Sequence, residues 1–410
     1  MTFQDLNLHA GLLQAIEELG HTKPTPIQSK AIPIILQGCD LRASAQTGTG
    51  KTAAFLLPIL NKLTMPSKLK GFGPRALILV PTRELAIQVA AETVKYSKHL
   101  SRMKTVCIYG GSPYPPQIRD LSRPYEILVA TPGRLIDHLE RERINFSRLE
   151  VFVLDEADRM LDMGFIQPVE QIAAAVPKSR QTLLFSATLK GSVMKLSQNL
   201  LRNPLEINVE PEDRNHENIE QRLHYVDDVN HKHDLLDHLL KDPLINQAIV
   251  FTATKHLAEL LMKKLIKNGH NAGALHGDMN QRQRTSTISK VRQGEIRILV
   301  ATDVAARGID VLSISHVINF DLPSSAEDYV HRIGRTGRAG GKGLALSFAA
   351  NKDMHLVKRV EQFTGQKITP HVIVGLEPQA KPSTRPPSPR GPNAGHYRKK
   401  SPSNFRNRSR

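Results

Sequence analysis

Val151-Phe152-Val153-Leu154-Asp155-Glu156-Ala157-Asp158 is the stretch of sequence that decides the fold. Its four apolar residues predict a buried strand, and three carboxylates follow directly. In open α/β sheets, ligands bind at the carboxyl ends of the strands. The stretch therefore predicts an α/β protein with acids at that edge of a parallel sheet. A solvated helix start is the alternative, because Asp and Glu favour first turns, but the preceding strand argues against it.

A second stretch, residues 45–52, has the composition of a loop that binds phosphate. Its glycines, Gly48 and Gly50, let backbone amides face phosphate oxygens, and Lys51 is placed to reach the β- and γ-phosphates. A helix is expected to begin here, and its amino terminus favours anions. The strict pattern starts with Gly where this chain has Ala45. A chance glycine turn is the alternative, which the downstream acids disfavour. The full stretch is Ala45-Gln46-Thr47-Gly48-Thr49-Gly50-Lys51-Thr52.

These two stretches together are typical of a nucleotide triphosphatase. Asp155 and the Thr52 hydroxyl are expected to hold Mg²⁺, and Glu156 to orient and deprotonate the attacking water. Two carboxylates are needed because a carboxylate bound in the field of a metal is a poor base.

The charge of the chain favours a polyanionic partner, most simply a nucleic acid. The net charge is +17 over 410 residues. Residues 371–410 contain nine Lys or Arg and one acid, whereas residues 1–370 contain 47 basic and 38 acidic residues. No run of 18 apolar residues and no secretory signal is found, and Cys39 and Cys107 form no metal spacing. We therefore expect a cytoplasmic protein whose thiols stay reduced.

The order of apolar runs predicts two sheet domains. Short runs alternate with longer amphipathic stretches from about residue 30 to 205, and the alternation restarts near residue 248, which is typical of βαβ units. The first set has strands at 76–80, 127–130, 151–154 and 182–185, and the second at 248–251, 297–300, 316–320 and 344–348. The predicted parts are an ATP-binding domain (1–209), a linker (210–218), a second domain (219–377) and a tail (378–410).

The tail differs in composition from the rest of the chain. Residues 378–410 contain seven Pro, five Ser, nine Lys or Arg and no acid, so they cannot bury enough apolar surface to fold alone. Tyr397 and Phe405 lie among the basic residues, where nucleic-acid bases could stack on them. We expect a disordered basic tail that contacts nucleic acid, and a solvated, non-specific tail is the alternative.

Further motifs follow in a fixed order and give the chain a family resemblance. With them, residues 3 to about 350 resemble the DEAD-box family of ATP-dependent RNA helicases, in helicase superfamily two. The chain length, Ser44-Ala45-Gln46 and the short basic tail resemble bacterial RhlE-type members. The motifs are Gly20-His21-Thr22-Lys23-Pro24-Thr25-Pro26-Ile27-Gln28 (a Q motif), Pro81-Thr82-Arg83-Glu84-Leu85-Ala86, Gly110-Gly111, Thr131-Pro132-Gly133-Arg134, Ser186-Ala187-Thr188, Val250-Phe251-Thr252, Gln281-Arg282-Gln283-Arg284, residues 301–310 and His331-Arg332-Ile333-Gly334-Arg335-Thr336-Gly337-Arg338.

The resemblance implies a set of ATP-site residues. Phe3 would stack on the adenine and Gln28 would read its edge, since an amide both donates and accepts. Asp310 would bind the ribose hydroxyls. Arg335 and Arg338 would contact the γ-phosphate as arginine fingers, a role worth about 10³–10⁵ in rate in other NTPases. The implied catalytic residues are Lys51, Glu156, Arg335 and Arg338, and the implied ATP-binding residues are Phe3, Gln28, 45–52 and Asp310.

The resemblance also implies an RNA track and a coupling element. Loops after the strands would hold the RNA backbone, because small residues and hydroxyls allow close approach and Arg83 and Arg134 could meet phosphate. In many family members Arg83 supports the loop instead. Asp158 would bond to Ser186 and Thr188 and so couple hydrolysis to strand separation. The implied RNA-binding residues are Pro81, Thr82, Arg83, Gly111, Thr131, Arg134, Arg284 and Thr302.

The resemblance implies two tandem RecA-like domains that close on ATP and RNA. The expected function is RNA-stimulated ATP hydrolysis coupled to local, non-processive unwinding of RNA duplexes or remodelling of ribonucleoproteins. An ATP-gated RNA clamp or scaffold with little unwinding is the alternative. A DNA helicase is disfavoured by the Q motif and the unaltered Asp-Glu-Ala-Asp tetrad. Ribosome assembly, cold adaptation and mRNA decay stay open, with ribosomal or degradosome-type proteins as partners.

Overall fold

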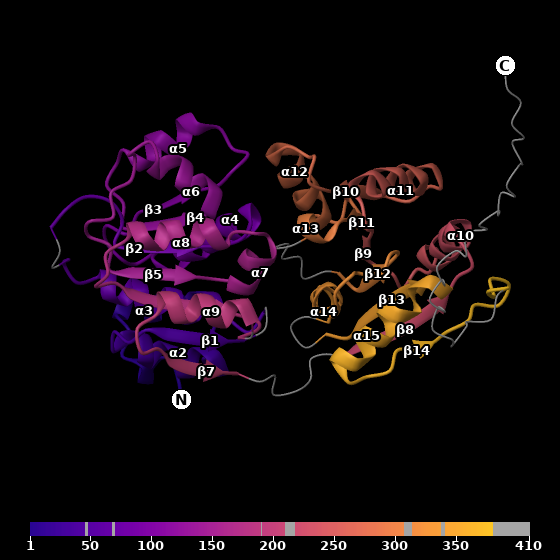
Figure 1. Ribbon diagram of the computed structural model, residues 1–410, viewed down its shortest axis with the longest axis horizontal. Helices are drawn as coiled ribbons and strands as arrows, with labels where there is room; N and C mark the ends of the chain where they lie inside the picture. Colours follow the sequence, from indigo (N-terminus) through magenta and orange to yellow (C-terminus); the bar gives the residue numbers. More distant parts are fainter. Residues whose placement is uncertain are drawn as a thin grey trace, which may run out of the picture.

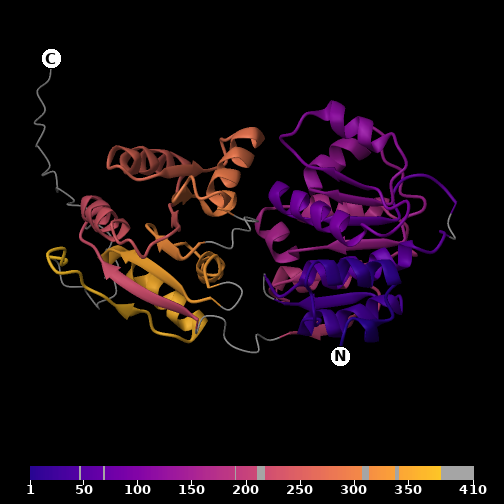
Figure 2. The same cartoon turned by 180° about the vertical axis from the view of Figure 1, so that it is seen from behind.

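Two seven-stranded parallel sheets form the framework of the chain, and Figures 1 and 2 show them side by side. The computed structural model describes residues 1–45, 48–67, 70–189, 191–209, 218–306, 314–337 and 341–379. The predicted fold class, α/β with two tandem RecA-like sheets, is confirmed. Residues 210–217 of the predicted linker and 380–410 of the predicted tail lie outside the described residues.

The first sheet has the strand order β3-β4-β2-β5-β6-β1-β7. The apolar run at residues 151–154 forms the central strand, β5, which is fully buried and pairs with β2 and β6. A central strand buried on both faces needs apolar residues at every position, which this run supplies. The strands are β1 (Leu41–Ser44), β2 (Ala76–Leu79), β3 (Thr105–Ile108), β4 (Ile127–Ala130), β5 (Val151–Leu154), β6 (Gln181–Ser186) and β7 (Leu205–Asn208).

Helices cover both faces of this sheet. Successive strand residues point to opposite faces, so an all-apolar strand presents apolar side chains on both faces, and both must be buried. Ile78 and Val153 pack into one core, and Leu77 and Phe152 into the other. The first core receives side chains from η1 (Gln4–Leu6), α1 (Ala10–Glu18), α2 (Pro26–Leu36), α3 (Lys51–Leu63) and α4 (Arg83–Tyr96). The second receives them from α5 (Tyr114–Leu121), α6 (Pro132–Leu139), α7 (Ala157–Asp162), α8 (Ile166–Ala175) and α9 (Gly191–Leu200).

The second sheet repeats this plan with the order β10-β11-β9-β12-β13-β8-β14. Val250 of β9 packs beneath two helices on one face, and its neighbour Ile249 packs on the other. The strands are β8 (Ile219–Tyr225), β9 (Ala248–Phe251), β10 (Ala272–Leu275), β11 (Ile298–Ala301), β12 (His316–Asn319), β13 (Gly343–Ala349) and β14 (Thr369–Pro370). The helices are α10 (Val229–Leu240), α11 (Lys255–Lys267), α12 (Gln281–Arg292), α13 (Asp303–Ala306), α14 (Ala326–Ile333), η3 (Asn351–Asp353) and α15 (Met354–Thr364).

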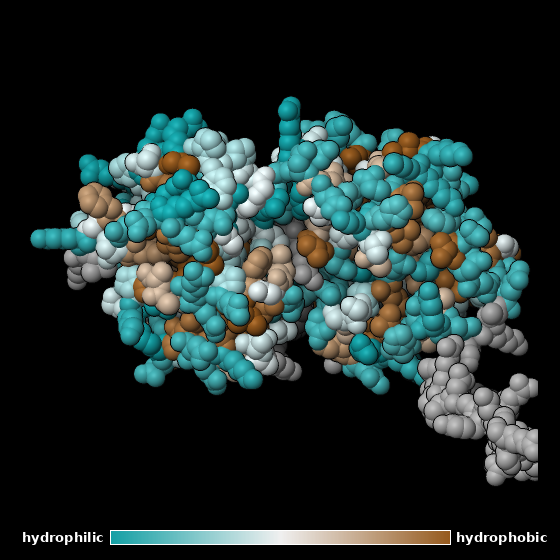
Figure 3. Space-filling view, turned by 45° about the horizontal axis from the view of Figure 1, so that its top comes forward, coloured by the Kyte–Doolittle hydropathy of each residue, from teal (hydrophilic) through white to brown (hydrophobic). Residues whose placement is uncertain are grey.

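The eight strands predicted from apolar runs are all present, with ends shifted by one residue at most. Other strands, such as β1 and β3, were missed because polar residues shorten or interrupt their apolar runs. On the face drawn in Figure 3, apolar residues lie scattered among hydrophilic ones. Cys39 and Cys107 are unpaired, and burial raises the pKa of the Cys107 thiol to about 12. Among the helices of the described residues, none has the length and apolar character needed to cross a bilayer.

Candidate functional site

The carboxyl edge of the first sheet is divided into two halves by the strand order. The phosphate loop follows β1, the acids follow β5, and Ser186 ends β6, and these three strands are neighbours. The segments predicted to bind RNA follow β2, β3 and β4, which occupy the other half of the sheet. The structure therefore groups the predicted site residues by ligand, with the β2–β5 boundary between the two groups.

The phosphate loop leads directly into helix α3. Gly48 and Gly50 have φ values of 88° and 90°, and Gly50 caps the helix, so both positions need glycine. A Cβ on Gly50 would also collide with the side chain of Gln28. Lys51 begins the helix, is only 6% exposed, and its ammonium has no hydrogen-bond partner in the described part of the chain. A buried, unpartnered cation at a helix amino terminus fits an anionic ligand.

Asp155 is the second incompletely compensated group of this half. The side chain is 2% exposed, and burial raises the pKa of its carboxyl to about 7. The charge of Lys51 opposes this rise, and the neighbouring acids Glu156 and Asp158 add to it. The printed hydrogen bond to the Asp155 carboxylate comes from the Glu156 amide, at 3.0 Å. A cation placed against this carboxylate would restore its ordinary acidity.

Glu156 lies at the turn from β5 into α7. Its backbone is left-handed (φ 53°, ψ 51°), which is uncommon for a residue with a side chain and marks a functional position or a constrained turn. The carboxylate is mostly buried and lies 3.6 Å from the guanidinium of Arg159. This turn places Glu156 and Asp155 on adjacent parts of the same edge.

Asp158 is bonded to the loop that follows β6. Its carboxylate accepts hydrogen bonds from the amides of Ala187 (2.9 Å) and Thr188 (3.1 Å), and its own amide donates to the Ser186 hydroxyl (3.3 Å). The structure thus brings together the three residues predicted to couple hydrolysis to RNA. The amide of Ala187, a backbone group that side-chain patterns cannot reveal, completes the network.

The Q motif is built around the capping box of α2. The Gln28 amide accepts from the Thr25 backbone (3.0 Å) and donates to the carbonyl of Gly50 (3.1 Å), so it joins the motif to the phosphate loop. Phe3 is 5% exposed and belongs to the core beneath this region. The predicted contacts of Gln28 and Phe3 with adenine stay predictions.

In the half of the edge that is predicted to bind RNA, the loops after β2 and β3 are stabilised by contacts within the protein. The Thr82 hydroxyl caps α4 by accepting from the Leu85 amide (3.3 Å), and Pro81 is buried beside it. The guanidinium of Arg83 lies against Gly111, where a Cβ would collide with it, and Gly111 has a φ of 76°. Arg83 therefore supports the Gly110-Gly111 loop in this structure, as in the family members that use it this way.

Arg134 is likewise committed to protein groups. It is 8% exposed, donates to the carbonyl of Ser112 (2.9 Å), and lies 3.4 Å from the carboxylate of Asp137. Its guanidinium also lies 4.1 Å from the centre of the Tyr114 ring. Thr131 precedes it at the end of β4 and is 7% exposed. The predicted phosphate contact of Arg134 stays a prediction.

An ion pair joins the two domains beside the segments that are predicted to bind RNA. Arg284 at the start of α12 bonds through Nε to the carboxylate of Glu84 on α4, at 2.8 Å. Both side chains are nearly buried, at 7% and 10% exposure. The other guanidinium nitrogens donate to the carbonyls of His276 (3.4 Å) and Ala305 (3.1 Å). Arg284 thus connects the second domain to the first through its ion pair with Glu84.

The second domain presents its motifs around Arg332. This side chain forms a two-point ion pair with Asp303 (2.6 and 2.7 Å) and also donates to Asn319 (3.0 Å). It therefore holds α13, which follows Thr302, against α14. Arg335 follows α14 and is 7% exposed. The pairing of Arg332 with Asp303 was not predicted, because the resemblance implied no role for either residue.

His331 lies where the two domains meet on the ATP side. Burial, followed by the charge of Arg159, lowers the pKa of its imidazole to about 3, and Asp158 acts in the opposite direction. Such influence requires α14 of the second domain to lie close to α7 of the first. Of the predicted site residues, Gln46, Thr47, Asp310 and Arg338 lie outside the described residues.

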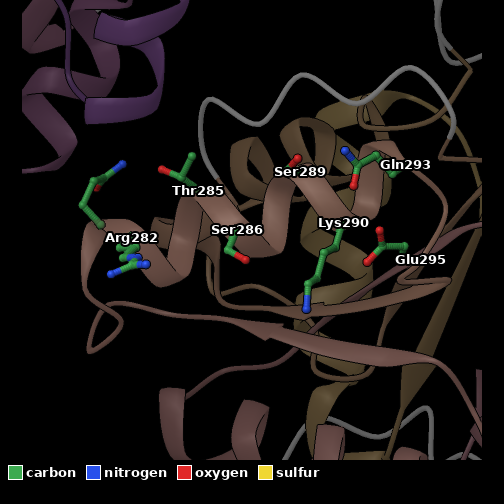
Figure 4. Close-up of a pocket in the computed structure, with 8 residues that line it drawn as sticks. Arg282, Thr285, Ser286, Ser289, Lys290, Gln293 and Glu295 are labelled. Atoms are coloured by element: carbon green, nitrogen blue, oxygen red, sulfur yellow. The ribbon is translucent and has the colours of Figure 1, made fainter.

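A shallow polar hollow of about 530 Å³ lies along α12. Figure 4 shows Thr285, Ser286 and Lys290 along this helix, with Glu295 beyond its end. Two of its lining residues, Gln281 and Arg282, belong to the same motif as Arg284. The hollow therefore adjoins the segment of the second domain that is predicted to complete the RNA track.

Two family models match the chain, one in each sheet domain. The model described as DEAD/DEAH box helicase matches residues 25–196, and the helicase conserved C-terminal domain matches residues 231–340. The matched ranges contain the phosphate loop, the acids and the second-domain motifs.

Two curated bacterial relatives are similar over most of the chain. The ATP-dependent RNA helicase DeaD of Mycobacterium tuberculosis is 47% identical over 368 residues, which are 90% of this chain and 64% of the relative. The DEAD-box ATP-dependent RNA helicase RhpA of Helicobacter pylori is 44% identical over 361 residues, 88% of this chain and 72% of the relative. The chain thus spans about two thirds of the length of these relatives.

A solved structure shares the arrangement of both domains. Dbp5 of Saccharomyces cerevisiae bound to RNA and ADP BeF3 matches with a TM-score of 0.81 and 32% identity, over 90% of this chain and 95% of that one. A Dbp5 variant bound to Nup159, Gle1, IP6 and ADP gives 0.62 at 30% identity, over 89% and 95%. The two domains here are therefore arranged more like those of Dbp5 bound to RNA and ADP BeF3 than like those of the other Dbp5 complex.

Proposed function

The chain belongs to the DEAD/DEAH box helicase family, and we propose that it hydrolyses ATP when RNA binds and uses this to open short RNA duplexes or remodel ribonucleoproteins locally. One observation carries the proposal above the others. Lys51 and Asp155 are buried, incompletely compensated charges beside a network that links Asp158 to the β6 loop. Such a site fits a nucleoside triphosphate and can transmit its hydrolysis.

In the proposed chemistry, each residue acts on ATP from a fixed element. Lys51 binds the β- and γ-phosphates from the start of α3, and Glu156 orients and deprotonates the attacking water. Arg335 and Arg338 contact the γ-phosphate from the second domain, so hydrolysis requires closed domains. Gln28 and Phe3 bind the adenine, and Asp310 binds the ribose.

The donor set at the edge also fits Mg²⁺. The ion prefers oxygen ligands and is usually held by one or two carboxylates together with substrate phosphates. Asp155 offers one carboxylate that is incompletely compensated, and Thr52 offers a hydroxyl one residue after Lys51. These two residues would hold the ion, which when bound neutralises charge on the β- and γ-phosphate oxygens.

RNA is proposed to lie along the other half of the edge. The loops after β2, β3 and β4 present small residues and backbone, which suit contacts to sugar and phosphate without sequence preference. Contact by Pro81, Thr82, Arg83, Gly111, Thr131, Arg134, Arg284 and Thr302 would follow from this path. The Dbp5 structure, whose domain arrangement this chain shares, is bound to RNA and ADP BeF3 together, which supports the proposal that this chain binds both ligands.

The proposal is tested with Glu156→Gln, which keeps the shape of the site and removes the base. We expect the rate of RNA-stimulated ATP hydrolysis to fall by about 10²–10⁴ while ATP-dependent RNA binding persists. Unchanged turnover would contradict the proposal. Release of a short RNA duplex, measured with and without ATP, distinguishes unwinding from the alternative clamp, which would bind and hydrolyse without releasing strands.

Some finer assignments stay predictions. The named relatives are DeaD and RhpA, so the RhlE-type subgroup has no support from them. Ribosomal or degradosome-type partners, a cytoplasmic location and RNA contact by the tail at 378–410 rest on the sequence alone. The tail prediction concerns residues that lie almost wholly outside the described ranges.

A further inference from the structure

Tyr114 is the first residue of α5, and it belongs to none of the motifs of the family resemblance. It follows the Gly110-Gly111 loop by three residues and is partly buried. We propose that Tyr114 is a positioning residue for RNA: by holding the Arg134 guanidinium, it fixes the 110–112 loop in the shape that accepts the RNA backbone. This inference rests on the proposed function, because it assumes that the loop contacts RNA.

The ring of Tyr114 is surrounded by groups from α6 and the turn after it. The guanidinium carbon of Arg134 lies 4.1 Å from the ring centre, and that of Arg141 lies 5.2 Å away. His138 meets the ring edge-on, with centres 5.5 Å apart. The hydroxyl donates to the Asp137 carboxylate at 2.9 Å. Two cations over the ring, one edge contact and one hydrogen bond leave the ring little freedom to turn.

This arrangement acts on the loop through Arg134. The guanidinium that lies over Tyr114 donates to the carbonyl of Ser112, at 2.9 Å, directly after the glycine pair. The guanidinium of Arg83 lies against the preceding residue, Gly111. Two neighbouring loop residues are thus held, Gly111 by Arg83 from α4 and Ser112 by Arg134, which packs on Tyr114. Loss of the aromatic face would free Arg134 and remove one of these two restraints.

The groups around the contact between Tyr114 and Arg134 are buried and have few hydrogen-bond partners, so the ring is important for holding the guanidinium in place. The Nε of Arg134 is buried and has no hydrogen-bond partner among the described residues, since the Asp137 carboxylate at 3.4 Å is an ion pair only. His138 is fully buried and neither ring nitrogen has a partner there. With few hydrogen bonds available, the cation–ring contact is a main constraint on the guanidinium. Such contacts are worth about 0.5–2 kcal/mol, so removing one is measurable.

The test measures the single-stranded RNA concentration that half-saturates ATPase stimulation of the full chain. Tyr114→Leu keeps apolar volume and removes the ring face, and we expect the half-saturating concentration to rise about three- to tenfold. The KM for ATP and the rate at saturating RNA should stay unchanged. Tyr114→Phe keeps the ring face and should stay within about twofold of the parent, as a conservative rescue. The split between RNA affinity and rate separates positioning from general damage.

Two further variants serve as controls. One tests whether a loss of stability alone changes RNA half-saturation, and the other tests whether a change of charge alone explains the result. Tyr125→Leu removes another buried ring of the same domain, 4% exposed and just before β4, and should lower Tm without changing RNA half-saturation. Asp137→Ala removes the carboxylate that lies 3.4 Å from the Arg134 guanidinium and so takes away a second restraint on Arg134, at a side chain that is 45% exposed. Loss of a negative charge alone would strengthen binding to a polyanion. Positioning predicts the opposite, a rise of about twofold or more.

The outcomes separate this inference from the proposed function. If RNA stimulates the parent chain but both Tyr114→Leu and Asp137→Ala leave half-saturation unchanged or lower it, the inference is wrong and the proposed function stands. If RNA does not stimulate the parent chain, both are wrong. If Tyr114→Leu does not fold, the direction of change in Asp137→Ala decides: weaker RNA binding supports positioning, and tighter binding overturns it.

Discussion

The two halves of the first sheet's edge treat charge in opposite ways. On the ATP side, the ammonium of Lys51 is buried without a hydrogen-bond partner in the described chain, and the carboxyl of Asp155 has a pKa raised to about 7. On the half proposed to bind RNA, Arg134 donates to a backbone carbonyl and pairs with a carboxylate, and so does Arg284, which reaches this half from α12 of the second domain. The half proposed to bind ATP thus has incompletely compensated buried charges, whereas the arginines of the other half are bonded to protein groups.

The difference teaches how one edge can serve two kinds of ligand. A small, highly charged ligand gains most from buried charges that nothing else satisfies, because interactions are strong where water is excluded. A long polymer bound by its backbone needs a fixed path of loops instead, and arginines can build that path from within. We therefore expect substitutions on the ATP side to cost activity, and those on the RNA side to cost affinity and stability.

The largest effect is expected for Lys51→Met. Removal of the ammonium should lower the rate of ATP hydrolysis by about 10²–10³, since one preorganised stabilising group is lost. Without nucleotide, however, Tm should stay the same or rise, because an unpartnered buried cation is replaced by an apolar side chain of similar length. ATPase kinetics and thermal unfolding of the nucleotide-free protein check the two parts. A clear fall in Tm would show that Lys51 is compensated, and the contrast between the halves would be lost.

A smaller effect is expected at the ion pair between the domains. Glu84→Gln and Arg284→Gln should each weaken RNA binding, measured with a non-hydrolysable ATP analogue, by about tenfold, and the double variant should be little worse than either single one. A buried pair that loses one partner leaves the other uncompensated, which explains the lack of additivity. Additive losses would mean that the two residues act separately.

An exposed ion pair in the second domain provides the matched control. Lys255 and Asp278 lie 2.7 Å apart, with side chains 60% and 61% exposed. Exposed pairs contribute little, so Lys255→Ala should leave RNA binding within about twofold of the parent. An equal loss in this variant would show that the assay reports on charge alone.

How much the sequence could predict differs between strands and side-chain partners. The run at 151–154 predicted β5 correctly because a central strand must be apolar at each position. β1 (Leu41–Ser44) was missed because it includes Arg42, which pairs with Glu206 on the neighbouring β7. Short strands with polar residues do not differ from loops in composition, so only their pairing identifies them.

The site shows the same limit at the level of single residues. The family resemblance implied that Asp158 bonds to Ser186 and Thr188, and the structure brings the three together. The sequence could not predict that Arg134 bonds to the carbonyl of Ser112, because a backbone acceptor leaves no mark in the sequence. The predicted contact of Arg134 with phosphate stays a prediction.

The smallest effect is expected for the pH dependence of stability at His138. Burial, then the charges of Arg134 and Arg143, lowers the pKa of this imidazole to about 4 in the folded chain, against an ordinary value of 6.5. The unfolded chain takes up a proton below pH 6.5 and the folded chain does not, so stability is lost as pH falls from about 6.5 to about 4. By pH 5 this amounts to roughly 1–2 kcal/mol.

His138→Met tests this by removing the titrating group. The fall in Tm between pH 7.5 and pH 5 should be smaller in the variant than in the parent. His224 and His331, whose pKa values are also lowered, to about 4 and about 3, contribute equally to both proteins and cancel in the comparison. Identical pH profiles would show that His138 can be protonated in the folded chain.

The central claim is that the edge of the first sheet binds ATP in one half and RNA in the other, and that the two act together. The most direct test is the ATPase rate of the full chain with single-stranded RNA and with DNA of matched sequence and length. We predict strong stimulation by RNA and little by DNA, since a track that reads sugar and phosphate can sense the 2′-hydroxyl. Equal stimulation by both, or by neither, would contradict the account.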